Sequence, residues 1–106
     1  MPILTHSFVT LEELDAEVKQ VIKQLGPDVV RVNYNVGEDT TGDVSLHFRI
    51  VITDAAARRE TLASATRSIR DTVNERLAPM ARWGLFPYFS FRSESEQAER
   101  SEPEWS

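Results

Sequence analysis

The chain has no cysteine among its 106 residues. Disulfide bonds, thiolate catalysis and zinc or iron–sulfur sites with cysteine ligands are therefore excluded. The sequence also lacks an apolar run long enough for a membrane span, and its first ten residues lack the basic residues of a signal peptide. These absences predict a cytoplasmic protein that has no membrane partner.

Residues arranged for common catalytic chemistry are also scarce. The four glycines form no glycine-rich phosphate-binding loop, and no serine lies in a G-x-S-x-G motif. The two histidines, His6 and His47, do not make a metal site by themselves, because several ligands must converge on an ion. We therefore expect no enzymatic activity, no catalytic residues, no bound metal and no cofactor.

Charge is unevenly distributed along the chain. The net charge is −5, and residues 93–106 contain five glutamates and one arginine. That segment has almost no apolar residue before Trp105, a composition typical of disordered chains. The sequence predicts a single α+β domain over residues 1–92 and an acidic, flexible tail over residues 93–106.

The first predicted helix starts at a capping box. Thr10 and Glu13 have the T-x-x-E spacing, in which each side chain bonds to the backbone amide of the other residue. Apolar residues then recur at helical spacing as far as Leu25. Gly26 and Pro27 follow, and this pair predicts the end of the helix.

The second predicted helix extends from Ala55 to Leu77. Thr53 or Asp54 is expected to cap its start, because short polar side chains favour that position. Pro79 is expected at its end or just beyond it, because proline cannot continue a helix.

Three segments alternate apolar and polar residues, which predicts half-buried strands. They are Val30–Val36, the stretch VSLHFRIVIT at Val44–Thr53, and a strand that begins after Pro87 or lies at a sheet edge. The turn-forming run between the first two favours antiparallel pairing. We therefore predict an αββαβ two-layer sandwich, with a three-stranded, mainly antiparallel sheet and two helices on one face.

The run from Val29 to Arg92, with VSLHFRIVI in its middle, resembles the cytoplasmic domain of cation diffusion facilitator transporters in its order of elements. The resemblance implies a βαβ core and a dimer. The additional histidines that bind metal in that family have no counterparts here, so the resemblance does not extend to metal transport.

One face of the predicted sheet carries no helix, and its polar side chains are the first candidate site. Antiparallel sheets commonly leave one face in water, so a simply solvated face is one interpretation. Arginine and tyrosine are favoured at interfaces, so contact with another protein or a second copy is another. A platform for single-stranded nucleic acid is less favoured, because the domain is not basic. The candidate residues are Arg31, His47, Arg49, Tyr88 and Arg92.

The tail supplies a second candidate. Its sequence EPEW ends in an aromatic residue, and an exposed Trp105 is suited to docking on a partner. Trp83 is expected in the core or at its rim.

Our hypothesis is a non-enzymatic, bacterial-type interaction protein: a small subunit, a homodimeric adaptor, or an antitoxin- or immunity-like neutraliser. Its alternative is a nucleic-acid-binding module on the same face.

Overall fold

The computed structural model describes residues 11–38, 40–100 and 105. It has three α-helices and a three-stranded mixed sheet, which confirms the α+β class. A π-helical turn and a third helix occur in addition to the elements expected from the sequence. In chain order the elements are α1 (Leu11–Ile22), β1 (Val29–Glu38), β2 (Val44–Ile52), α2 (Leu62–Arg76), η1 (Pro79–Trp83), β3 (Phe86–Ser93) and α3 (Glu94–Arg100).

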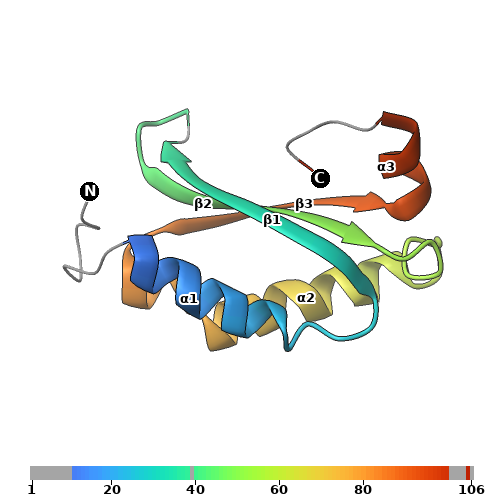
Figure 1. Ribbon diagram of the computed structural model, residues 1–106, viewed down its shortest axis with the longest axis horizontal. Coiled ribbons are helices and arrows are strands. Elements are labelled where there is room, and N and C mark those ends of the chain that lie inside the picture. The colour runs from blue at the N-terminus through green and yellow to red at the C-terminus, as the bar shows by residue number, and fades with distance from the viewer. Residues whose placement is uncertain (1–10, 39, 101–104, 106) are drawn as a thin grey trace.

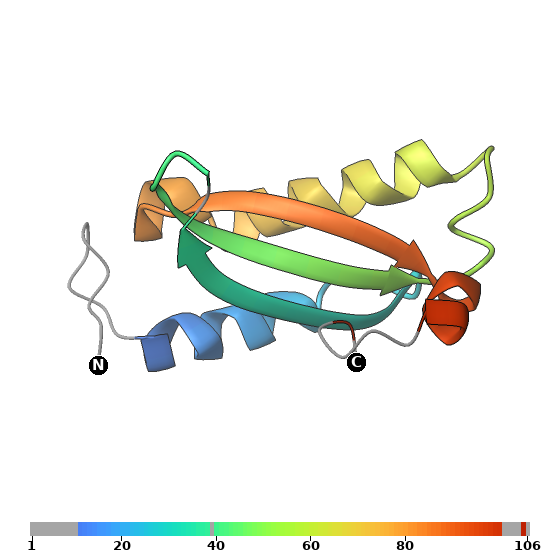
Figure 2. The same cartoon turned by 90° about the horizontal axis from the view of Figure 1, so that it is seen from above.

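The sheet has the order β1-β2-β3, with β2 in the centre. β1 pairs antiparallel with β2, whereas β3 pairs parallel with β2. A parallel neighbour needs a crossover connection, and α2 supplies it. Figure 1 shows α1 and α2 on one side of the sheet and α3 at one end of the other side, onto which Figure 2 looks. We call this second side the helix-free face, because neither α1 nor α2 packs on it.

The core lies between the two long helices and the sheet. β2 points four apolar side chains toward the helices at every second position, and all four are buried, as the alternation predicts. Burial of one such side chain stabilises the fold by about 1.5–3 kcal/mol. Trp83 is also buried in this core, as expected. The central group is Leu46, Phe48, Ile50 and Ile52 from β2, Leu14 and Val18 from α1, and Ile69 and Val73 from α2.

α2 begins at Leu62, so the predicted start at Ala55 is wrong. The Thr53 hydroxyl accepts a hydrogen bond from the Ala56 amide at 3.1 Å, so the expected capping residue closes a turn instead of a helix. The Thr61 hydroxyl donates to the Ala55 carbonyl oxygen at 2.8 Å and holds that turn in place. Residues 54–61 consequently form successive turns before the helix starts.

The ends of the other elements agree better with the sequence. Gly26 has a φ of +85°, the left-handed conformation expected of a glycine that follows a helix. β3 contains Pro87 and lies at an edge of the sheet, one of the two positions predicted for a strand with a proline. Thr10 lies outside the described residues, so the predicted capping box is not described.

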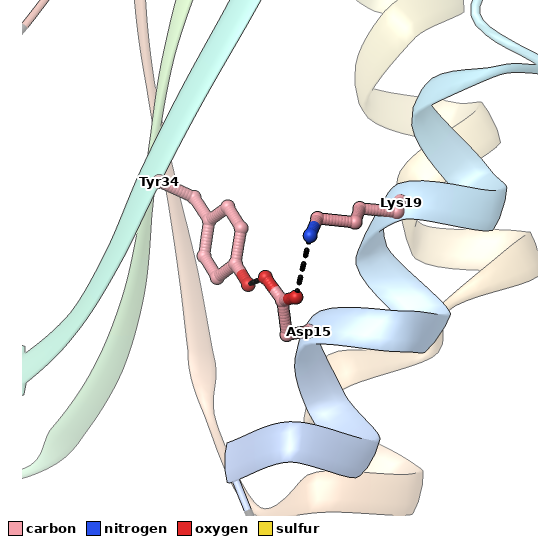
Figure 3. A network of polar contacts seen from close by, with 3 residues as sticks. All are labelled: Asp15, Lys19 and Tyr34. Atoms are coloured by element: carbon pink, nitrogen blue, oxygen red, sulfur yellow. Dashed lines mark hydrogen bonds and ion pairs between the residues drawn. The ribbon is translucent and has the colours of Figure 1, made fainter.

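A polar network attaches α1 to β1 (Figure 3). The Tyr34 hydroxyl donates to a carboxylate oxygen of Asp15, and Lys19 lies 2.9 Å from the other oxygen. The bond from Tyr34, followed by that from Lys19, lowers the pKa of Asp15. Burial and the bond to Asp15 raise the pKa of Tyr34 well above its ordinary value. This network occupies the helix side, so the opposite face keeps its own set of polar groups.

Candidate functional site

The strand register brings the predicted face residues into three neighbouring rows. Each row takes one residue from each strand, and residues paired across strands point to the same face. The rows alternate with the core residues of β2, so they lie on the helix-free face. The rows are Asn35–His47–Tyr88, Asn33–Arg49–Ser90 and Arg31–Val51–Arg92.

The first row belongs to an open end of this face, where aromatic rings meet solvent. Tyr88 is 42 % exposed, and Phe86, two residues earlier on the same strand face, is 38 % exposed. The His47 ring is half-buried and lies with its centroid 5.0 Å from that of Tyr88. We call Phe86, Tyr88 and His47 the aromatic patch. Aromatic side chains exposed in this way are enriched in binding surfaces.

Arg49 lies beside the aromatic patch in the next row. One of its guanidinium nitrogens donates to the side-chain oxygen of Asn35 on β1. This hydrogen bond orients the guanidinium, whose remaining N–H groups suit a carboxylate or phosphate. Arg31 is exposed in the third row. The open end therefore combines the aromatic patch with the guanidinium of Arg49, whereas Arg31 lies in the row of Val51 and Arg92 at the other end of the face.

The other end of the face is covered. Val51 is only 1 % exposed although neither α1 nor α2 packs on this side. Its row neighbour Arg92 is 8 % exposed, and the Arg92 guanidinium carbon lies 4.1 Å from the centre of the Trp105 ring. Trp105 itself is 7 % exposed, so the expectation of an exposed tryptophan is wrong. Arg92 also donates to the Gln97 amide oxygen at 3.1 Å.

The segment Glu94–Arg100 forms helix α3, so the prediction of a flexible tail is wrong for these residues. Its start is a capping box: the Ser93 hydroxyl accepts from the Glu96 amide at 3.1 Å, and Glu96 accepts from the Ser93 amide at 3.3 Å. α3 lies at the end of β2 and β3, away from α1 (Figure 2). Local capping thus orders a segment whose composition is typical of disorder.

A second contact joins α3 to the turn after β2. Asp54 accepts from the Ser95 amide at 3.1 Å and from the Ser95 hydroxyl at 2.7 Å. These hydrogen bonds lower the pKa of Asp54, because they favour its ionised form. Asp54 was expected as a possible helix cap for α2, and it instead bonds to residues at the start of α3. We call Glu94–Arg100 together with Trp105 the C-terminal cover.

Three parts of this surface were missed from the sequence. Phe86 was left out because the strand was expected to start after Pro87, although its i, i+2 relation to Tyr88 places both on one face. The Ser93–Glu96 capping box has the same spacing as Thr10 and Glu13, and could have been found by that rule. The Arg92–Trp105 contact had no local signal.

A cleft of about 420 Å³ lies by β3, and its walls include Phe89 and Phe91 together with Arg92 and Glu96. The guanidinium carbon of Arg70 on α2 lies 5.3 Å from the centre of the Phe91 ring.

Among residues 11–38, 40–100 and 105, no three His, Cys, Asp or Glu side chains come together as metal ligands would. No helix in this described part is long and apolar enough to cross a membrane.

Comparisons with family models, with curated proteins and with solved structures give no match to this chain. The resemblance to the transporter domain accordingly stays an expectation. Function has to be inferred from the helix-free face and its two unlike ends.

Proposed function

We propose that this protein is a non-enzymatic interaction module that binds another protein through the helix-free face of its sheet. The observation that carries the proposal is the aromatic patch, in which Phe86 and Tyr88 are exposed beside His47. Rigid aromatic side chains lose little conformational entropy when they are buried in an interface. They are therefore the side chains most suited to anchor a partner.

The cations on the helix-free face define the chemistry of the partner. Arg49 is held in place by Asn35, and Arg31 is exposed on the same face. A partner that offers carboxylates around an apolar centre would complement both groups. With such a partner the chain would act as a small subunit, an adaptor or a neutralising protein of the cytoplasm, and a second copy of the chain is a further candidate partner. Arg92 and Trp105 join such a site only when the C-terminal cover moves.

The proposal is tested with a paired set of variants. Native mass spectrometry of the tagged protein, purified gently from its own host at low salt, identifies bound protein, a homodimer or bound nucleic acid. The double variant Phe86→Ser/Tyr88→Ser should lose the bound protein. The control Leu62→Ser/Met80→Ser removes two similarly exposed apolar side chains that lie off this face, and it should keep the partner. Equal capture by both variants would contradict the proposal.

The second candidate is binding of single-stranded nucleic acid, and Phe86 favours it. With Phe86 the face carries two exposed aromatic rings beside His47 instead of one, and exposed rings on a sheet can stack with bases. The net charge of −5 opposes this candidate, since phosphate binding depends on cations. A nucleic-acid complex should weaken steeply between 50 and 200 mM salt, whereas an aromatic protein interface should change little.

A further inference from the structure

We propose that the C-terminal cover is a self-docked occupant of the helix-free face, which a partner segment of similar chemistry displaces. The inference rests on the proposed function and concerns the regulation of that same surface. In the closed state Val51 and Arg92 are buried, with Arg92 against Trp105 and Gln97 of the cover, while the aromatic patch stays exposed. In the open state the two ends join into one larger surface.

The first support is that the core is complete without the cover. The buried cluster between the helices and the sheet contains no residue of Glu94–Arg100 and does not include Trp105. Val51 is likewise outside that cluster, although it is buried. Removal of the cover therefore exposes one end of the sheet face and leaves the packing of α1 and α2 unchanged. Segments of this kind open at much lower free energies than core elements.

The second support is the nature of the attachments. The cover is held by Asp54 to Ser95, by Arg92 to Gln97, and by the stacking of Arg92 on Trp105. The bond between Asp54 and Ser95 is exposed to solvent. These are polar and cation–π contacts, and an incoming ligand can replace them with equivalent contacts.

The third support is chemical complementarity between the cover and the face. The cover carries Glu94, Glu96 and Glu99 and ends at an aromatic ring, while the face carries Arg31, Arg49 and Arg92. In the chain's own segment the groups that meet the face are the Gln97 amide oxygen and the Trp105 ring, both on Arg92. An acidic peptide with a tryptophan is the partner chemistry that competes with the cover.

The test uses a fluorescein-labelled peptide of residues 94–106 and the full-length chain, with fluorescence anisotropy as the readout. A tethered segment competes with the peptide at an effective concentration in the millimolar range, so the wild-type chain should bind the peptide weakly. The variant Trp105→Ala empties the ring site and should bind the same peptide at least about tenfold more tightly. Circular dichroism confirms that the variant is folded.

Two matched substitutions assign the binding to this site. Adding Arg92→Gln to Trp105→Ala should reduce peptide affinity about tenfold, because the cation under the ring is lost. Adding Arg70→Gln instead removes a guanidinium that packs on Phe91, and it should leave affinity unchanged. A peptide with alanine in place of its tryptophan should not bind. Equal binding to the wild-type chain and Trp105→Ala, absence of binding to both, or indifference to Arg92→Gln would overturn the proposal.

A label in the unmutated chain gives an independent readout. In protein grown with 5-fluorotryptophan, excess unlabelled peptide should shift the ¹⁹F resonance of Trp105 toward its solvent-exposed position and leave that of Trp83 unchanged. A resonance of Trp105 that does not respond would contradict the proposal. The peptide experiments contain no outside partner, so their failure would concern the cover alone. Failure of the proposed function would appear as unchanged partner capture by Phe86→Ser/Tyr88→Ser.

Discussion

The two ends of the helix-free face are built from the same three strands, but the side chains are buried at one end and exposed at the other. At one end, Val51 and Arg92 are buried, and the Arg92 guanidinium lies against the Trp105 ring. At the other end, Phe86 and Tyr88 remain exposed although they have more apolar surface than their neighbours. The chain thus protects one end by its own C-terminal residues and leaves the other end for contact with solvent or a partner.

This difference shows that the helix-free face is not uniform in its burial or in its side chains. Val51 is the one aliphatic side chain in the three polar rows, and it lies at the covered end. An aliphatic residue on a face without helices favours a cover there, because its burial removes apolar surface from water. The aromatic residues at the open end have polar edges or neighbours and tolerate exposure better.

The largest effect is expected from a charge placed beneath the cover. Val51→Asp should lower the free energy of unfolding by about 3 kcal/mol, because the burial of an aliphatic side chain is lost and the desolvation of the new carboxylate is only partly offset by its row neighbours Arg31 and Arg92. The variant Ser90→Asp places the same carboxylate at an exposed position. It should change the free energy of unfolding by no more than about 0.5 kcal/mol. Urea unfolding followed by circular dichroism measures both values. A small effect at both positions would show that the two ends do not differ in burial.

The next effect should come from the tryptophan that anchors the cover. Trp105→Ala should lower the free energy of opening α3 by about 2 kcal/mol, since the cation–π contact with Arg92 and the burial of the ring are lost. Native-state hydrogen exchange of the α3 amides measures this opening. Tyr88→Ala, a change of similar size at the open end, should leave α3 protection as it is. Loss of protection in both variants would mean that the ends are coupled.

The sequence predicted the part of this comparison that depends on local periodicity. Alternation along β2 assigned Phe48 and Ile50 to the core and His47 and Arg49 to the helix-free face, as the register shows. Periodicity works here because a strand has only two faces, and the hydrophobic effect decides which one is buried.

The covered end was not predicted, because it depends on a contact between distant residues. The proximity of Arg92 and Trp105 follows from the path of α3, which local patterns do not report. Composition suggested disorder for residues 93–106, and the capping box at Ser93 and Glu96, which indicates a helix start there, was missed. The early start expected for α2 failed for a related reason, since a capping side chain such as Thr53 closes turns as well as helices.

A smaller effect is expected at the capping box of the cover. Ser93→Ala removes the hydroxyl that accepts from the Glu96 amide, and it should lower the stability of α3 by about 1 kcal/mol. Hydrogen exchange of the α3 amides again reports the change. Ser90→Ala, on the same strand but without a cap, is the control and should have no effect on α3. If both serines behave alike, the cap does not contribute to holding the cover.

The smallest effect is expected from pH. Hydrogen bonds from Ser95 lower the pKa of Asp54 in the folded chain, so these bonds contribute stability above the ordinary aspartate pKa of about 3.9. That contribution is lost as the pH falls through the lowered pKa, because the protonated carboxyl is a poorer acceptor. In protein labelled with 5-fluorotryptophan, the Trp105 resonance should therefore move toward its exposed position over this acidic range. Asp54→Asn keeps one acceptor oxygen but cannot titrate, so its Trp105 resonance should lose this part of the pH dependence. The same pH profile in the variant would show that the titration of Asp54 does not link the turn after β2 to the cover.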